Sequence, residues 1–166
     1  MNRIEEHFVA SFLVRIYIKG LIKIPKSFAY LNEFIEILAE IIAKTPEIQN
    51  HINPIKLLLM PSSFSGYDSF KSGLMKTINK PGFNNYLEDQ EYYYLNIDED
   101  IVEYIINTKN TILGTLNDFM DDICNKFIDK INESSLSYIC YSEGEPVKEA
   151  IQLLKRENKT YQKKCS

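Results

Sequence analysis

Residues 98–132 read DEDIVEYIINTKNTILGTLNDFMDDICNKFIDKIN, and this stretch decides the fold that the sequence predicts. Its apolar residues recur at spacings of three, four and seven, which is the pattern of a helix with a buried stripe. A second apolar row lies beside the first, so the buried face can contact more than one neighbouring helix. The two rows are Ile101, Ile105, Ile112, Leu116, Phe119, Ile123 and Phe127, and Val102, Ile106, Leu113, Met120, Cys124, Ile128 and Ile131. We therefore expect one long central helix. Poor helix formers at residues 107–111, together with Gly114, leave a kink or break near Asn110 open.

The rest of the chain also favours helices. Gly and Pro are scarce, with six of each. Apolar stripes over residues 4–17 and 28–42 predict two more helices, of which the first is buried on most sides. Residues 86–96 could be helical or extended, and residues 136–141 could form one short strand. The predicted fold class is thus all-α or mostly α, a compact multi-helix bundle around the long helix in the C-terminal half.

The length of 166 residues suits a single helical domain, because such a chain can bury a core without disulfides or metal. We expect its basic tail, residues 157–166, to be frayed. Three cysteines without a C-x-x-C pair indicate a reduced compartment. The N-terminus is acidic where a signal peptide is basic, and charges interrupt the apolar run of residues 8–24. We therefore predict a cytoplasmic protein that does not enter the membrane.

Charge is unevenly distributed along the chain. The net charge of −4 combines +3 over residues 1–80, −9 over residues 81–133 and +2 over residues 134–166. An acidic middle repels phosphate, which argues against nucleic acid as a ligand. A basic protein is the better electrostatic match for this region.

The acidic charge is concentrated beside tyrosines. Residues 81–108 contain seven acids and no Lys or Arg. Tyrosine offers contact area at low entropic cost, and carboxylates offer steering and charge-assisted hydrogen bonds to basic side chains. The pattern predicts a recognition surface for a basic partner. The alternative interpretation is that these residues form a solvated surface without a partner. The candidate partner-binding residues are Glu88, Asp89, Glu91, Tyr92, Tyr93, Tyr94, Asp98, Glu99, Asp100 and Glu103.

Carboxylates one helical turn apart are candidate Mg²⁺ ligands. This spacing occurs in Asp118-x-x-Asp121-Asp122 and in Glu33-x-x-Glu36. Against a metal site, the aspartates lie opposite the buried stripes and no histidine accompanies them. A solvated helix face explains both groups, so we predict no metal and no other cofactor.

Catalytic signatures are lacking in the sequence. His7 and His51 belong to no zinc or H-E-x-x-H pattern, and no phosphate-binding glycine motif or G-x-S-x-G is present. Cys124 falls in an apolar helical row, which predicts a buried and inert thiol. The exposed Cys165 lies in the tail. These observations predict that the protein is not an enzyme.

In its overall character, the chain resembles the small acidic bacterial immunity proteins that neutralise delivered toxins, including those of contact-dependent growth inhibition. The resemblance concerns an acidic helical chain that presents Glu88 to Glu103 beside tyrosines, and it involves no aligned motif. It implies a non-catalytic inhibitor that binds a cognate basic toxin, such as a nuclease, and occludes its active site. Two alternatives stay open. One is a regulatory or adaptor domain for a small apolar ligand or a partner subunit, and the other is a carboxylate-metal enzyme.

Overall fold

The computed structural model describes residues 3–44, 64–84, 87–107 and 113–140. Within these residues the protein is mostly helical, as the sequence predicted, and it also contains a two-stranded antiparallel sheet. The described elements are α1 (Arg3–Ile18), β1 (Lys23–Pro25), α2 (Phe28–Ala43), α4 (Phe64–Ile78), β2 (Tyr92–Tyr94), α5 (Glu99–Asn107), the 3-10 helix η2 (Gly114–Phe119), α6 (Met120–Glu133) and the 3-10 helix η3 (Ser137–Ile139).

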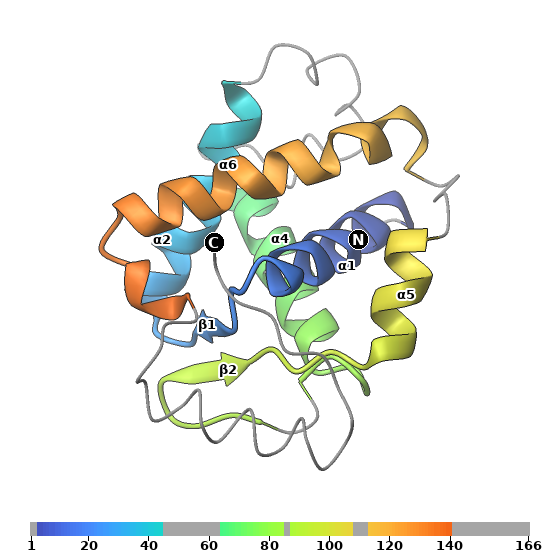
Figure 1. The fold of residues 1–166 in the computed structure, drawn as a ribbon. Coiled ribbons are helices and arrows are strands. Elements are labelled where there is room, and N and C mark those ends of the chain that lie inside the picture. Colours follow the sequence, from blue (N-terminus) through green and yellow to red (C-terminus); the bar gives the residue numbers. More distant parts are fainter. Residues whose placement is uncertain (1–2, 45–63, 85–86, 108–112, 141–166) are drawn as a thin grey trace.

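Helix α1 lies at the centre of the fold. It contacts α4, α5 and α6, and Figure 1 shows it in the middle of the molecule with α6 on one side and the strands on the other. Apolar side chains are fully buried on most sides of the helix, as the sequence predicted for this segment. They are Phe8, Val9, Phe12, Leu13, Val14, Ile16 and Tyr17.

Three phenylalanines join the helices of the core. Phe12 of α1 and Phe34 of α2 each meet Phe127 of α6 edge to face, with ring centroids 5.0 Å apart in both pairs. Phe12 and Phe34 close the triangle at 6.3 Å. Edge-to-face packing places the positive edge of one ring on the negative face of another, so the triangle sets the relative positions of three helices.

The expectation of one long helix over residues 98–132 is wrong. Asp98 precedes the first turn as predicted, and its carbonyl accepts the N–H of Val102 at 3.1 Å. Helix α5 then runs in a different direction from α6 (Figure 1). Gly114 has a φ of +57°, a left-handed conformation that a right-handed helix cannot continue through. Residues 108–112, with Asn110, lie outside the described residues.

The two apolar rows of this stretch are nevertheless largely inside. Leu113, Leu116, Met120 and the apolar residues of α6 are buried. Ile101, Ile105 and Phe119 pack against the core while partly exposed. Ile106 is the exception, with 40% of its surface exposed. The helical period therefore identified the buried face correctly even though the segment is divided.

A strand over residues 136–141 is also not found in the described part of the chain. Residues 137–139 form η3, and only Cys140 pairs with another strand-like residue, Leu21, in an isolated bridge. The reason is local. The Ser134 hydroxyl accepts the N–H of Leu136 at 3.0 Å, which turns the chain back directly after α6. Residue 141 and the tail at residues 157–166 lie outside the described residues.

The two strands bring distant segments together. After α1, the N–H of Leu21 donates to the carbonyl of Ile16 at 2.9 Å. The N–H of Gly20 donates to the carbonyl of Tyr17 at 3.0 Å, and Gly20 has a φ of +98°. This is a Schellman turn, which requires the left-handed conformation that glycine supplies. It directs the chain into β1, where Lys23 pairs with Tyr94 of β2.

Truncating the centre of the phenylalanine triangle should weaken the whole fold. We expect Phe127→Ala to lower the free energy of unfolding by about 3 to 5 kcal/mol, because the change leaves a cavity among three helices. The matched control is Phe28→Ala, since Phe28 is 67% exposed and its loss should change the free energy by less than about 0.5 kcal/mol. Chemical denaturation of both variants measures the difference. Equal losses would contradict the assigned core.

Candidate protein-binding surface

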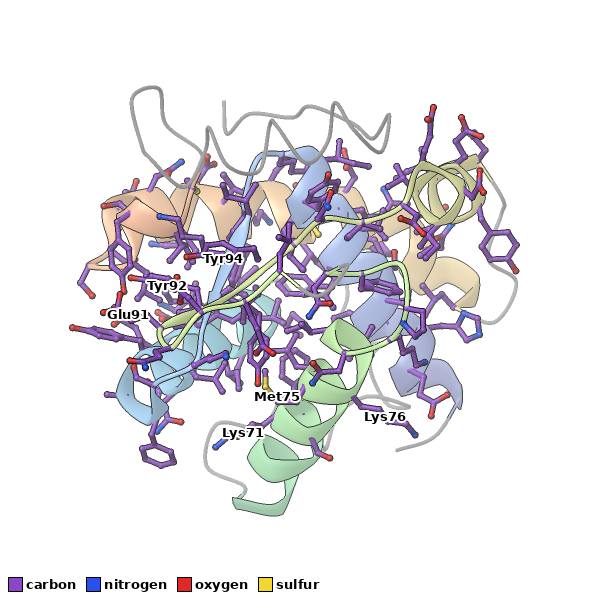
Figure 2. The ribbon with its side chains drawn as sticks, turned by 90° about the horizontal axis from the view of Figure 1, so that it is seen from below. Lys71, Met75, Lys76, Glu91, Tyr92 and Tyr94 are labelled. Carbon is purple, nitrogen blue, oxygen red and sulfur yellow. The ribbon has the colours of Figure 1, made fainter. Side chains whose placement is uncertain are left out.

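The ten predicted partner-binding residues are divided between two places. Residues 88–94 lie on β2 and on the turn that leads into it, whereas residues 98–103 lie at the start of α5. Figure 2 shows Glu91 and Tyr92 at one side of the molecule and the pale yellow helix α5 at the other. The acidic stretch is therefore not one continuous surface.

Asp89 holds the turn before β2. Its carboxylate accepts the N–H groups of Glu91 and Tyr92, both at 2.8 Å, and the hydroxyl of Tyr94. Partial burial opposes ionisation, but these hydrogen bonds outweigh it and hold the pKa of Asp89 below its ordinary value. Tyr94 is only 8% exposed, and burial followed by the bond to Asp89 raises its pKa. Tyr94 is thus buried, and Asp89, although exposed, has its carboxylate engaged in holding the turn.

Lys26 engages two more of the predicted residues. Its ammonium group lies 2.5 Å from a carboxylate oxygen of Glu88 and 4.6 Å from the centroid of the Tyr93 ring. Such a cation over an aromatic face is attractive. The negative charge of Glu88 and the face of Tyr93 are therefore already partly satisfied within the chain.

Tyr92 lines a surface hollow of about 600 Å³ with two tyrosines that the sequence analysis did not single out. Tyr30 comes from α2 and Tyr138 from η3, and their ring centroids are 6.4 Å apart. Tyr92 lies 6.0 Å from Tyr138. Tyr30 could have been noticed from the sequence, because it is an aromatic residue on the polar side of a predicted helix. The sequence around Tyr138 contains no comparable feature. The remaining lining residues are Lys26, Ser27, Gln90 and Glu91. We call this site the tyrosine hollow.

A buried lysine supports the hollow from within. Lys23 donates a hydrogen bond to the carbonyl of Tyr138 at 3.2 Å, and its nitrogen lies 5.4 Å from the centroid of the Tyr92 ring. Burial raises the pKa of Tyr138 to about 12, and the neighbouring Tyr92 adds to the shift. The phenols therefore stay protonated at neutral pH and can act as hydrogen-bond donors.

The N-terminal half of the α5 surface carries the other acids. Glu99, Asp100 and Glu103 are exposed, and none of them forms an ion pair with a residue that the structure describes. Asp98 is half-buried beside Gly82, whose carbonyl accepts its N–H at 2.7 Å. The same helix exposes 63% of Tyr104 and 40% of Ile106. We call Glu99, Asp100, Glu103, Tyr104 and Ile106 the α5 face.

The carboxylates considered as metal ligands have other contacts. Asp121 lies 3.6 Å from Arg15 and 3.2 Å from Lys19, and Asp122 lies 3.1 Å from Lys126 on its own helix. Cations next to a carboxylate compete with a metal ion for its charge. Within residues 3–44, 64–84, 87–107 and 113–140, no three His, Cys, Asp or Glu side chains are grouped so that they could hold a metal. In the other candidate pair, the carboxylate of Glu33 accepts a hydrogen bond from the hydroxyl of Ser135, and Glu36 is exposed.

The structure also places the remaining candidate side chains. Burial raises the pKa of the Cys124 thiol to about 12, and the thiol points toward the carbonyl of Phe12 at 4.0 Å. An inert Cys124 is what the apolar row predicted. His7 is half-buried on α1. His51 and Cys165 lie outside the described residues.

A second depression lies between α2 and α6 and has a volume of about 590 Å³. Ile37 and Ile41 contribute apolar surface, but charged side chains of both signs surround them, including the neighbouring Glu40 and Lys44. A small apolar ligand is normally held in an enclosed, mostly apolar cavity. This groove is open and charged, so it gives little support to the alternative of a domain for an apolar ligand.

No protein-family model matches the chain, and the searches of curated proteins and of solved structures give no match either. Among the described helices, none combines the length and the apolar character needed to cross a membrane.

Neutralising Asp89 should loosen the turn before β2 in a pH-dependent way. Because its pKa is lower in the folded protein, its stabilising effect is present above the unfolded pKa and is lost as the pH falls through the folded value. We expect Asp89→Asn to cost about 1 kcal/mol of unfolding free energy at neutral pH. The cost should shrink below about pH 4.

Chemical denaturation across this pH range measures the effect, with Asp129→Asn as the control, because Asp129 is exposed on α6 outside its first turn and makes no ion pair with a described residue. A loss that is the same at every pH, or equal for the two variants, would show that the carboxylate of Asp89 does not hold the turn.

Proposed function

We propose that the protein is a non-catalytic binding protein that captures a basic protein partner through the α5 face. In keeping with the resemblance to immunity proteins, the partner class that we propose is a cognate toxin with a basic active site, such as a nuclease. Covering that active site would inhibit the toxin, and the inhibition would need no cofactor and no chemistry. The proposal places this activity in the cytoplasm.

The observation that carries the proposal is the exposed state of the acids on α5. Unlike Glu88, Asp89 and Asp121, the side chains of Glu99 and Asp100 have no cationic or hydrogen-bonding partner among the described side chains. Their position in the first turn is favourable for α5 itself, because a helix N-terminus carries partial positive charge. Their fields nevertheless extend into solvent, where they can accelerate encounter with a basic surface.

Apolar area beside these acids supports the same function. Tyr104 and Ile106 are two of the four large apolar side chains that are markedly exposed in the described part of the chain. A buried aromatic anchor surrounded by charged residues is the usual composition of an energetic hot spot. The α5 face combines both components on one helix.

Neutralising the α5 face should slow association. We expect the combined change Glu99→Gln, Asp100→Asn and Glu103→Gln to reduce the association rate about tenfold at low salt. The difference should fade as salt shortens the Debye length toward about 8 Å and below. Stopped-flow or surface-based kinetics with the product of the adjacent gene measures both effects, since immunity genes lie beside their toxin genes.

The matched control is Glu36→Gln, Asp129→Asn and Glu133→Gln, which removes the same charge from exposed positions on α2 and α6. Thermal unfolding of both triple variants checks that the fold is kept. If the control slows association as much as the α5 variant, net charge alone steers the encounter. If neither variant matters, the α5 face is only a solvated surface.

Truncating Tyr104 tests whether this exposed tyrosine of α5 contributes to the affinity for the partner. We expect Tyr104→Ala to weaken partner binding by about 2 kcal/mol, mainly through faster dissociation. Phe28→Ala serves as the control, because Phe28 is a similarly exposed aromatic residue on a different helix. Titration calorimetry gives both affinities. An unchanged affinity for Tyr104→Ala would remove Tyr104 from the contact.

A further inference from the structure

The tyrosine hollow, defined above by Tyr30, Tyr92, Tyr138 and their neighbours, has the features of a binding site that the α5 face does not explain. Three segments far apart in the sequence each contribute one ring to it. The rings of Tyr30 and Tyr138 are inclined at 80°, and those of Tyr92 and Tyr138 at 62°. Rings inclined in this way present both faces and edges to the space between them.

The rings are held in place by the fold. Tyr92 lies in β2 opposite Pro25 of β1, and a side-chain hydrogen bond links Tyr92 to Tyr138. Lys23 fixes the backbone of Tyr138 through its carbonyl. Tyr30 is 48% exposed at the opening. Two walls are therefore fixed before a ligand arrives, which lowers the entropic cost of binding.

Two charged side chains, Lys26 and Glu91, line the hollow, and they differ in how far their charge is already paired. Lys26 is bound to Glu88 and Tyr93, and Lys23 does not line the hollow. Glu91, by contrast, is an exposed residue of the lining, and its carboxylate makes no ion pair or hydrogen bond with a described residue. The negative faces of the tyrosine rings add to its attraction for positive charge.

We propose that the tyrosine hollow binds the guanidinium group of an arginine side chain presented by another protein. Glu91 accepts hydrogen bonds from the guanidinium, and the planar group stacks against the rings of Tyr30 and Tyr92. A guanidinium suits this site better than an ammonium, because it is flat, weakly hydrated and able to bond a carboxylate through two N–H groups. The volume of about 600 Å³ is ample for one such side chain.

This inference does not depend on partner binding at the α5 face, because a free arginine derivative can test it. The probe is argininamide, titrated into the full chain while amide and tyrosine ring signals are followed by NMR. Citrullinamide is the matched probe, since it has nearly the same shape and the same α-amino group but a neutral urea in place of the charged guanidinium. We expect saturable shifts at Tyr30, Tyr92, Tyr138 and Glu91 with argininamide in the millimolar range, and none that saturate with citrullinamide.

Three variants should change the affinity for argininamide, two of them lowering it and one raising it. We expect Glu91→Gln and Tyr30→Ala each to weaken argininamide binding about three- to fivefold, through loss of the carboxylate and of one ring face. Lys26→Gln removes a positive charge from the wall and should tighten binding about twofold. The control is Glu36→Gln, which lies on the exposed side of α2 and should change nothing. Thermal unfolding verifies the fold of each variant.

The proposal is overturned by three results. Argininamide and citrullinamide binding equally would show that the positive charge plays no part. Weaker argininamide binding in Lys26→Gln would show that the ligand is not held as a cation beside the charge of Lys26. Shifts confined to residues outside the hollow, or no saturation at all, would show that the hollow does not bind this group.

Discussion

Burial of α1 on most of its sides is the constraint on which the rest of the structure depends. A helix buried in this way must have apolar partners in several directions, and α4, α5 and α6 provide them. Phe12 is the clearest case, since it lies against Phe34 and Phe127 at once. At the edge of α1, Arg15 and Lys19 reach the surface and pair with Asp121. The charge of Asp121 is therefore offset by cations from α1 and the residue that follows it.

The end of α1 organises the surface as well as the core. The Schellman turn at Gly20 sends the chain into β1, and β1 pairs with β2. This pairing places Lys23 and Lys26 against the tyrosines of β2. Basic residues from the N-terminal half thus offset part of the acidic stretch, and they do so through contacts that only the folded chain makes. The carboxylate of Glu91 has no such pair among the described residues, because the ammonium group of the neighbouring Lys26 is bound to Glu88 instead.

Two surfaces with different physical characters result. The α5 face is an exposed helix surface with several charges that no described residue pairs, which suits long-range steering and broad contact. The tyrosine hollow is concave, has fixed rings and one carboxylate, and suits a single inserted side chain. They lie at opposite sides of the view in Figure 2, so a partner that used both would have to extend across the molecule.

The sequence by itself determined the helical class, the buried faces of α1, α2 and α6, and the segment that contains the acidic surface. These properties follow from the local period of apolar residues and from composition, and both can be read along the chain. Residues 98–132 are divided into α5, η2 and α6, and between α5 and α6 the backbone takes a positive φ at Gly114 that this residue type allows but does not require. Which acids stay unpaired, and the meeting of Tyr30, Tyr92 and Tyr138, were decided only by the tertiary structure. Both depend on contacts between segments far apart in sequence, for which no local pattern exists.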